Sequence, residues 1–191
     1  MPTSTAILSA AYHLFIRRGY HGTSMRAIAR EAGIALGGIY NHFASKEEIF
    51  REVILAYHPY HEILPALMNV RHDTLAGLFR QAAGLIDAAL SERPEVLNLM
   101  FIELVEFDSR HVPELLDRIL PQVGPTLEQL NLSGDRLRPI PIPMVWRIFL
   151  GTILGYFISK HALGPGSPPE FREGALDHFM DVFLNGILEP K

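Results

Sequence analysis

The side chains that suggest chemistry in this chain lie between residues 23 and 46. Hydroxyls at Thr23 and Ser24 precede a predicted helix, Tyr40 follows, and Lys46 opens a further predicted helix. A helix start has free backbone N–H groups, and hydroxyl and ammonium groups beside it can hydrogen-bond phosphate oxygens. These groups are therefore able to bind phosphate. Helix capping is the alternative for Thr23 and Ser24, and a purely structural role is the alternative for Tyr40 and for His42.

The elements that position these groups are two short helices joined by a tight turn. The first predicted helix follows Ser24 and ends near Ala32, and Gly33 then occupies a turn that favours a residue with positive φ. Ala29, Gly33 and Ile39 have the spacing of a helix-turn-helix. In that motif a small residue is followed four positions later by a glycine, and six positions after that by a branched apolar residue.

The second helix of the pair, within residues 37–43, is too short and too rich in glycine to be stable alone. We expect its neighbours to hold it, as they hold a recognition helix presented to a DNA groove. Ser45 and Glu48 form a predicted capping box that starts the next helix. Ahead of the motif, residues 5–18 are predicted to form an amphipathic helix that completes a three-helix domain.

The first 50 or so residues resemble the DNA-binding domain of the TetR family of transcriptional regulators. The residues that carry the resemblance are Gly19-Tyr20, Thr23-Ser24, Ile28-Ala29, Ala32-Gly33-Ile34, Gly37, Tyr40, His42-Phe43 and Lys46-Glu47-Glu48. The resemblance implies an all-α fold, with a helix-turn-helix domain at residues 1–46 and a helical effector-binding and dimerisation domain at residues 47–191. It also implies a homodimeric repressor that binds double-stranded operator DNA and is released by a small-molecule effector.

The same resemblance, together with the chemistry of the side chains, assigns DNA contacts to Thr23, Ser24, Leu36, Gly37, Tyr40, Asn41, His42 and Lys46. Ala35, Leu36 and Gly38 depart from the family, which usually has Ser or Thr at the first of these positions and polar or basic residues at the other two. Few side chains are left that can hydrogen-bond a base edge. Contact of Leu36 with a thymine methyl group, or recognition of DNA shape, is therefore expected instead.

The net charge of −4 is divided unevenly along the chain. Residues 1–46 contain five basic side chains against Glu31 alone, which gives +4 for this segment and leaves −8 for the rest. A basic N-terminal segment on an acidic body is expected where one end of the molecule meets phosphate. A charged solvent-exposed face is the alternative explanation. The basic residues are Arg17, Arg18, Arg26, Arg30 and Lys46.

The remaining residues are predicted to be helical, with prolines near many boundaries. Helices are expected from Ser45 to Pro59, over residues 73–93, 95–109 and 144–163, from Pro113 onward and from Pro168 onward, with an extended linker at residues 131–143. We expect the last two helices to pair with those of a second copy as a four-helix dimer interface. The residues assigned to this interface are Gly151, Gly155, Ser159, Leu176, Phe179, Met180 and Phe183.

A candidate effector pocket is lined by Phe79, Met100, Phe101, Glu103, Phe107, Trp146 and Tyr156. A stripe of aromatic and methionine side chains also describes a plain core. Glu103 is the exception, because a carboxylate among apolar residues needs a cation, a metal or a hydrogen-bond donor. His58 and His61 have a spacing that can place two imidazoles on one helical face, but Pro59 interrupts it. No metal or other cofactor is therefore assigned.

Composition and missing motifs exclude several classes of protein. The chain has no cysteine, so disulfides and thiolate metal sites do not arise. No secretory leader is visible, and the uncharged core of the helix at residues 144–163 is too short for a bilayer, so a cytoplasmic protein without a membrane partner is expected. No phosphate loop, nucleophile elbow, HExxH motif or dinucleotide fingerprint is present, and no enzymatic activity is predicted. The alternative function is that of a helical small-molecule- or metal-binding protein whose N-terminal domain has lost its affinity for DNA.

Overall fold

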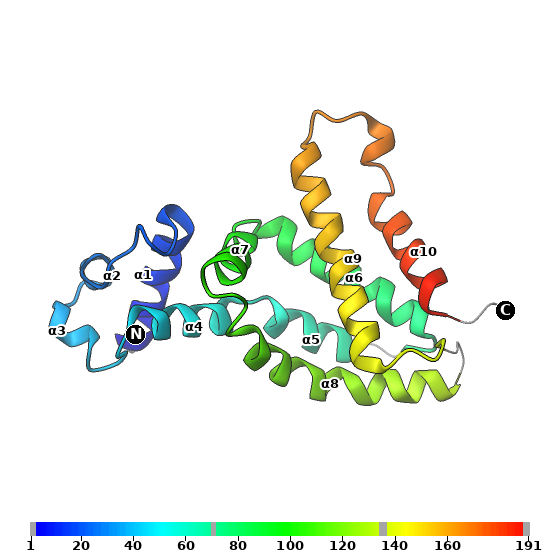
Figure 1. Ribbon diagram of the computed structural model, residues 1–191, viewed down its shortest axis with the longest axis horizontal. Helices are drawn as coiled ribbons and strands as arrows, with labels where there is room; N and C mark the ends of the chain where they lie inside the picture. The colour runs from blue at the N-terminus through cyan, green and yellow to red at the C-terminus, as the bar shows by residue number, and fades with distance from the viewer. Residues whose placement is uncertain (1–2, 70–71, 134–136, 189–191) are drawn as a thin grey trace. The chain divides into compact units, whose positions relative to one another are not determined.

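The computed structural model describes residues 3–69, 72–133 and 137–188. Within these ranges the chain is helical and has no strand beyond an isolated bridge between Leu137 and Leu188, which confirms the predicted all-α class (Figure 1). Contacts divide the chain into two compact units. The first consists of residues 1–61 and 89–119, and the second of residues 62–88 and 120–191.

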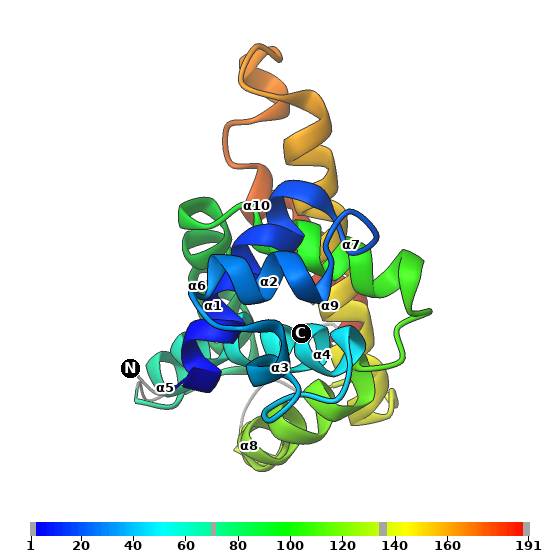
Figure 2. The ribbon, with the colours of Figure 1, turned by 90° about the vertical axis from the view of Figure 1, so that its left-hand side faces the viewer.

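The first unit is built on an N-terminal group of four helices and a fifth that packs against them. These helices are α1 (Thr3–Arg18), α2 (Met25–Glu31), α3 (Leu36–Ile39), α4 (Lys46–Tyr57) and α7 (Val96–Glu106) (Figure 2). The α4 helix packs against α1, and α7 contacts both. Their apolar faces share one core, in which Phe15 and Phe50 are fully buried and meet edge to face.

The α1 helix follows the predicted pattern of burial. Its inward face carries Ile7, Ala10, Ala11, Leu14 and Phe15, all of which are buried as the helical spacing predicts. The helix ends at a glycine, Gly19, with φ of 69°. A left-handed backbone of this kind closes a helix at little steric cost when the residue has no Cβ.

The helix-turn-helix is formed by α2 and α3. Ser24 caps α2 by accepting a hydrogen bond from the Ala27 N–H, and Gly33 makes the turn with φ of 71°, as predicted. The Ile34 N–H then donates to the Ala29 carbonyl at 3.0 Å, which draws the chain back onto α2. The α3 helix has four residues and no side-chain cap, so its neighbours hold it through fully buried Ile39.

The second unit is centred on α9 (Ile142–Leu163), which packs against α10 (Ala175–Ile187). Aromatic rings from these helices and from α6 (Leu75–Glu92) form its core: the rings of Phe79, Phe149 and Phe183 lie within 5.5 Å of one another, centroid to centroid. Two more helices, α5 (Tyr60–Met68) and α8 (Val112–Ser133), complete the fold. Like α6, they each contribute residues to both units.

Two sequence-based boundaries were wrong, each where proline was given too much weight. Pro65 lies inside α5, and α8 runs through Pro121 and Pro125 as far as Ser133. The predicted linker at residues 131–143 therefore overlaps α8 at its start and α9 at its end, and residues 134–136 lie outside the described ranges. Pro169–Phe171 forms a single 3₁₀ turn, and α10 begins after Gly174, whose φ of 64° breaks the helical path.

The α9 helix is also long and apolar enough, by length and composition, to cross a membrane. It has 22 residues with a mean hydropathy of 1.5 over its most apolar window, so the whole helix is longer than the uncharged core that sequence analysis considered. A single helix of this kind is weak evidence for a membrane span, because the core helix of a soluble protein passes the same test. Its buried face, which includes Val145 and Phe149, packs within the second unit.

Candidate DNA interface and neighbouring sites

The outer surface of the helix-turn-helix presents most of the residues predicted to touch DNA. Tyr40 is 54% exposed at the C-terminal cap of α3, and Asn41 and His42 beside it are exposed. On α3 itself Gly37 is exposed and Leu36 is half-buried. The structure thus places these five residues on α3 and the turn that follows it, and the small and apolar surface of α3 itself suits a groove floor better than a network of base hydrogen bonds.

Thr23 and Ser24 have different roles, although the sequence gives both a hydroxyl. Ser24 is exposed and caps α2, so its side chain lies beside the free N–H groups of that helix. Thr23 is 1% exposed, and its hydroxyl donates to the Gly19 carbonyl at 2.9 Å. In this conformation the Thr23 side chain offers no group to a phosphate, and it fixes the turn between α1 and α2 instead.

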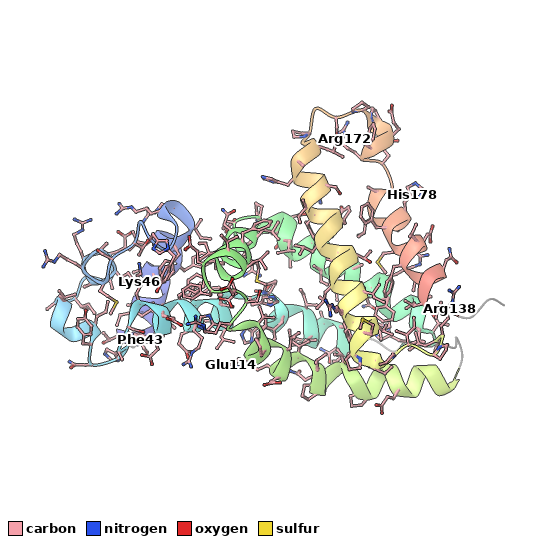
Figure 3. All side chains as sticks on the ribbon, in the orientation of Figure 1. Phe43, Lys46, Glu114, Arg138, Arg172 and His178 are labelled. Atoms are coloured by element: carbon pink, nitrogen blue, oxygen red, sulfur yellow. The ribbon has the colours of Figure 1, made fainter. Side chains whose placement is uncertain are left out.

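Lys46 is the first residue of α4, as predicted, but its ammonium group turns inward. Its Nζ donates to the carbonyls of Tyr20 and Thr23, each at 2.7 Å, and lies 4.0 Å from the centroid of the Tyr20 ring. Burial lowers the pKa of Lys46, because desolvation disfavours its charged form. Lys46 and Phe43, labelled in Figure 3, lie in the segment that leads from α3 into α4.

The first turn of α4 is held from several directions. Ser45 accepts a hydrogen bond from the Glu48 N–H at 3.0 Å, as the predicted capping box requires. The Glu48 carboxylate reaches one residue further back than expected and accepts from the Ala44 N–H at 2.7 Å. Glu47 forms an ion pair with Arg110 at 2.9 Å, which links α4 to the turn between α7 and α8.

That turn is organised by Glu103, which sequence analysis singled out as a buried carboxylate in need of a partner. Glu103 is 1% exposed, and its two oxygens accept from the His111 backbone N–H at 2.6 Å and from the His111 ring Nδ1 at 2.8 Å. Asp108 and Ser109 between them have positive φ, which L-residues adopt at some cost. The predicted need for a hydrogen-bond donor is therefore confirmed, and sequence reasoning missed the donor, His111, eight positions along the chain.

The residues of the predicted effector pocket are divided between the two units. Met100, Phe101, Glu103 and Phe107 belong to the first unit. In the second, Phe79 and Trp146 meet edge to face with their centroids 5.7 Å apart, and the buried Trp146 Nε1 has no hydrogen-bond partner among the described residues. Tyr156 donates its hydroxyl to Asp87 at 3.2 Å, and burial raises its pKa.

An apolar groove of about 560 Å³ runs between α9 and α10. It includes four residues of the predicted dimer interface and adds Ile148, Thr152, His178, Val182, Gly186 and Ile187. The four shared residues are Gly151, Gly155, Phe179 and Phe183. Met180 is buried within the protomer and Ser159 donates to the Tyr156 carbonyl, while Leu176 is half-buried on α10.

His58 and His61 make separate hydrogen bonds at the junction of α4 and α5. His58 Nδ1 accepts from the Tyr60 N–H at 3.2 Å, and His61 Nε2 donates to the Leu55 carbonyl at 2.7 Å. Burial lowers the pKa of His58 to about 4, and His61 adds to the effect. Among the described residues no group of three or more His, Cys, Asp or Glu side chains is arranged to hold a metal ion.

The chain is similar in sequence to a family model and to individual transcriptional regulators. The model of the tetR family of bacterial regulatory proteins matches residues 7–53. Over 97% of both chains the protein is 25% identical to the HTH-type transcriptional regulator YvkB of Bacillus subtilis. It is 32% identical to the HTH-type transcriptional repressor BepR of Brucella suis, over 61% of this chain and 57% of BepR.

A solved structure matches the fold over nearly its whole length. FadR of Bacillus subtilis, a transcriptional regulator solved in complex with stearoyl-CoA, has a TM-score of 0.75 and 18% identity over 96% of this chain and 98% of FadR. With the exposed α3, these matches identify a helix-turn-helix transcriptional regulator that binds DNA. The matched N-terminal model and the shared fold make the chain similar to regulators of the TetR family. The alternative, a binding protein whose N-terminal domain has lost its affinity for DNA, is not favoured.

Proposed function

We propose that the protein is a homodimeric repressor that binds a near-palindromic operator and leaves it when a small apolar effector binds. The observation that carries the proposal is the exposed strip formed by α3 and the residues after it, with Leu36, Gly37, Tyr40, Asn41 and His42 on one surface. Two such strips in a dimer would enter successive major grooves about 34 Å apart. Residues 1–46 read the DNA in this proposal, and residues 47–191 bind the effector and dimerise in the cytoplasm.

Dimerisation is proposed through the groove between α9 and α10. Val182 on its rim is 77% exposed, and Ile148, Leu154 and Ile158 on α9 are also exposed. Gly151 has no atom within 4 Å of the position that a Cβ would take, so a second helix can approach its backbone closely. An apolar helical face of this kind loses its contact with water when two copies pair.

The effector is proposed to be apolar with a hydrogen-bond acceptor. The buried aromatic cluster of Phe79, Trp146 and Phe149 supports the first property, and the unpaired Trp146 N–H supports the second. A buried donor without a partner costs about 1 to 3 kcal/mol, which an acceptor on a ligand would recover. FadR holds stearoyl-CoA, so an acyl-CoA series is the first set of compounds to test.

Operator binding is tested by selecting bound fragments from a genomic library of the source organism. We expect one near-palindromic sequence to be enriched. Tyr40→Phe removes a hydroxyl from the proposed interface, and roughly 3- to 10-fold weaker binding is expected if that hydroxyl reaches a phosphate. The matched control is Tyr57→Phe, which removes a hydroxyl from α4 at a half-buried position. Weak binding without sequence preference would contradict the proposal.

Dimerisation is tested with two valines of nearly equal exposure. Val182 lies on the groove rim and is 77% exposed, whereas Val105 lies on α7 and is 73% exposed. Val182→Glu is expected to give a monomer in light scattering, because it places charge in an apolar interface. Val105→Glu should remain a dimer. If both variants were dimeric, the groove between α9 and α10 would be excluded as the dimer interface.

Effector binding has a built-in reporter, because Trp146 is the single tryptophan of the chain. Titration with stearoyl-CoA and shorter acyl-CoAs should change its fluorescence and release the protein from the selected operator at the same concentrations. A fluorescence change without release would separate ligand binding from regulation. No change with any acyl chain length would exclude this class of effector at the Trp146 site.

A further inference from the structure

The ammonium group of Lys46 bridges two carbonyls of the turn between α1 and α2. The Tyr20 and Thr23 oxygens each lie 2.7 Å from Nζ, and the Tyr20 ring closes one side at 4.0 Å. Two of the three N–H donors of the ammonium group are therefore used inside the protein. The ammonium group therefore stabilises the turn between α1 and α2.

The turn between α1 and α2 has little freedom of its own. A Cβ added at Gly22 would lie 2.2 Å from the Arg18 carbonyl oxygen, so the backbone passes directly over the end of α1. Thr23 is buried and bonded to Gly19. The next residue, Ser24, caps α2, so the position of this turn sets the position of the α2 N-terminus.

Lys46 therefore joins the beginning of α2 to the beginning of α4. The α3 helix lies in the chain between these two points and is too short to hold a position alone. A link between Thr23 and Lys46 fixes both ends of the segment that contains it. Loss of the link would free the α2 N-terminus while leaving the buried apolar core of the first unit in place.

We propose that Lys46 is a positioning residue that orients the helix-turn-helix through the turn between α1 and α2, and that it is not a phosphate contact. This inference rests on the proposed operator binding and changes the role that the TetR resemblance assigns to Lys46. The protonated amine of Lys46 donates hydrogen bonds to two main-chain carbonyls, those of Tyr20 and Thr23. The side chain acts on DNA through Ser24 and α2, which it holds in place.

The test compares Lys46→Met and Lys46→Gln with the unaltered full-length protein on the selected operator. Methionine keeps the length of the side chain and loses every donor, whereas glutamine is uncharged and keeps two N–H donors. The expected order of affinity is Lys, then Gln, then Met, with Met weaker than Lys by roughly 10- to 100-fold. The slope of log affinity against log salt concentration should stay unchanged, because no phosphate contact is lost.

A phosphate contact predicts a different result. Both variants would lose the same charge, bind equally weakly, and reduce the salt slope by about 0.9 per protomer, or about 1.8 per dimer. That outcome would overturn the proposal.

A second measurement needs no DNA. Hydrogen exchange of the free protein should be faster in Lys46→Met at residues 20–31, and unchanged in the buried helices of the second unit. Unchanged exchange at residues 20–31 would overturn the proposal even if no operator were found. Hydrogen exchange tests the positioning role of Lys46, and library selection tests operator binding. A failure of the first proposal can therefore be distinguished from a failure of the second.

Discussion

The buried Glu103 gives the sharpest prediction about stability. Its oxygens accept two hydrogen bonds from His111, at 2.6 and 2.8 Å, inside a site where Glu103 is 1% exposed. Glu103→Leu introduces an apolar side chain of similar size and leaves both His111 donors without that acceptor. Hydrogen bonds to a charged group contribute about 1.5 to 3 kcal/mol each, so the loss of two should lower the free energy of unfolding by about 3 to 6 kcal/mol.

Glu103→Gln is the matched control for this loss. The glutamine oxygen still accepts from the His111 backbone N–H, and its amide N–H can donate to the ring Nδ1 in the other tautomer. A loss of about 1 kcal/mol is expected, because neutral hydrogen bonds replace charge-assisted ones. Urea unfolding followed by far-UV circular dichroism at pH 7 and one fixed protein concentration would measure both variants. A Leu variant within 1 kcal/mol of the unaltered protein would refute the reasoning, and equal losses for Leu and Gln would show that charge alone matters.

Three other predictions concern local features. His58 has its pKa lowered from 6.5 to about 4, so folding disfavours its protonated form and the stability that its neutral form contributes is lost as pH falls from 6.5 towards 4. His58→Asn keeps a side-chain acceptor at this position and should lose less stability between pH 7 and pH 5, by urea unfolding at both values; equal losses would contradict this. Gly22→Ala should lower the melting temperature and weaken operator binding, because its Cβ would lie 2.2 Å from the Arg18 oxygen. Gly84 is exposed on α6, and a Cβ added there meets nothing within 4 Å, so Gly84→Ala should stabilise the protein by about 0.5 to 1 kcal/mol; destabilisation measured by urea unfolding would contradict that expectation.

Sequence patterns predicted the local parts of the fold well. The apolar spacing of α1, the Ser24 and Ser45 caps and the positive φ of Gly33 all depend on a few neighbouring residues. Prolines misled the assignment of the linker at residues 131–143 and of the start of α10, because α9 begins before Pro143 and the Pro168-Pro169 pair opens only a single 3₁₀ turn.

The predicted sites were recovered less completely, because their chemistry depends on distant partners. The inward direction of Lys46 follows from carbonyls more than 20 positions earlier in the chain, which no pattern around position 46 reveals. Glu103 was recognised as an exception because its neighbours are apolar, but its partner follows a turn with two residues at positive φ. The DNA contacts, the effector site and the dimer interface stay predictions.

The two glycines of α3 make this regulator a convenient starting point for protein engineering. Gly37 and Gly38 lie on the proposed recognition helix, and a Cβ built at either position meets no atom within 4 Å. Side chains can therefore be added there without repacking the domain, and replacing glycine inside a helix also favours the helical state. A library of variants at these two positions would sample new base preferences on an unchanged scaffold. The absence of side chains at these two positions makes the natural operator hard to predict. It also leaves room for side chains that select a chosen DNA sequence.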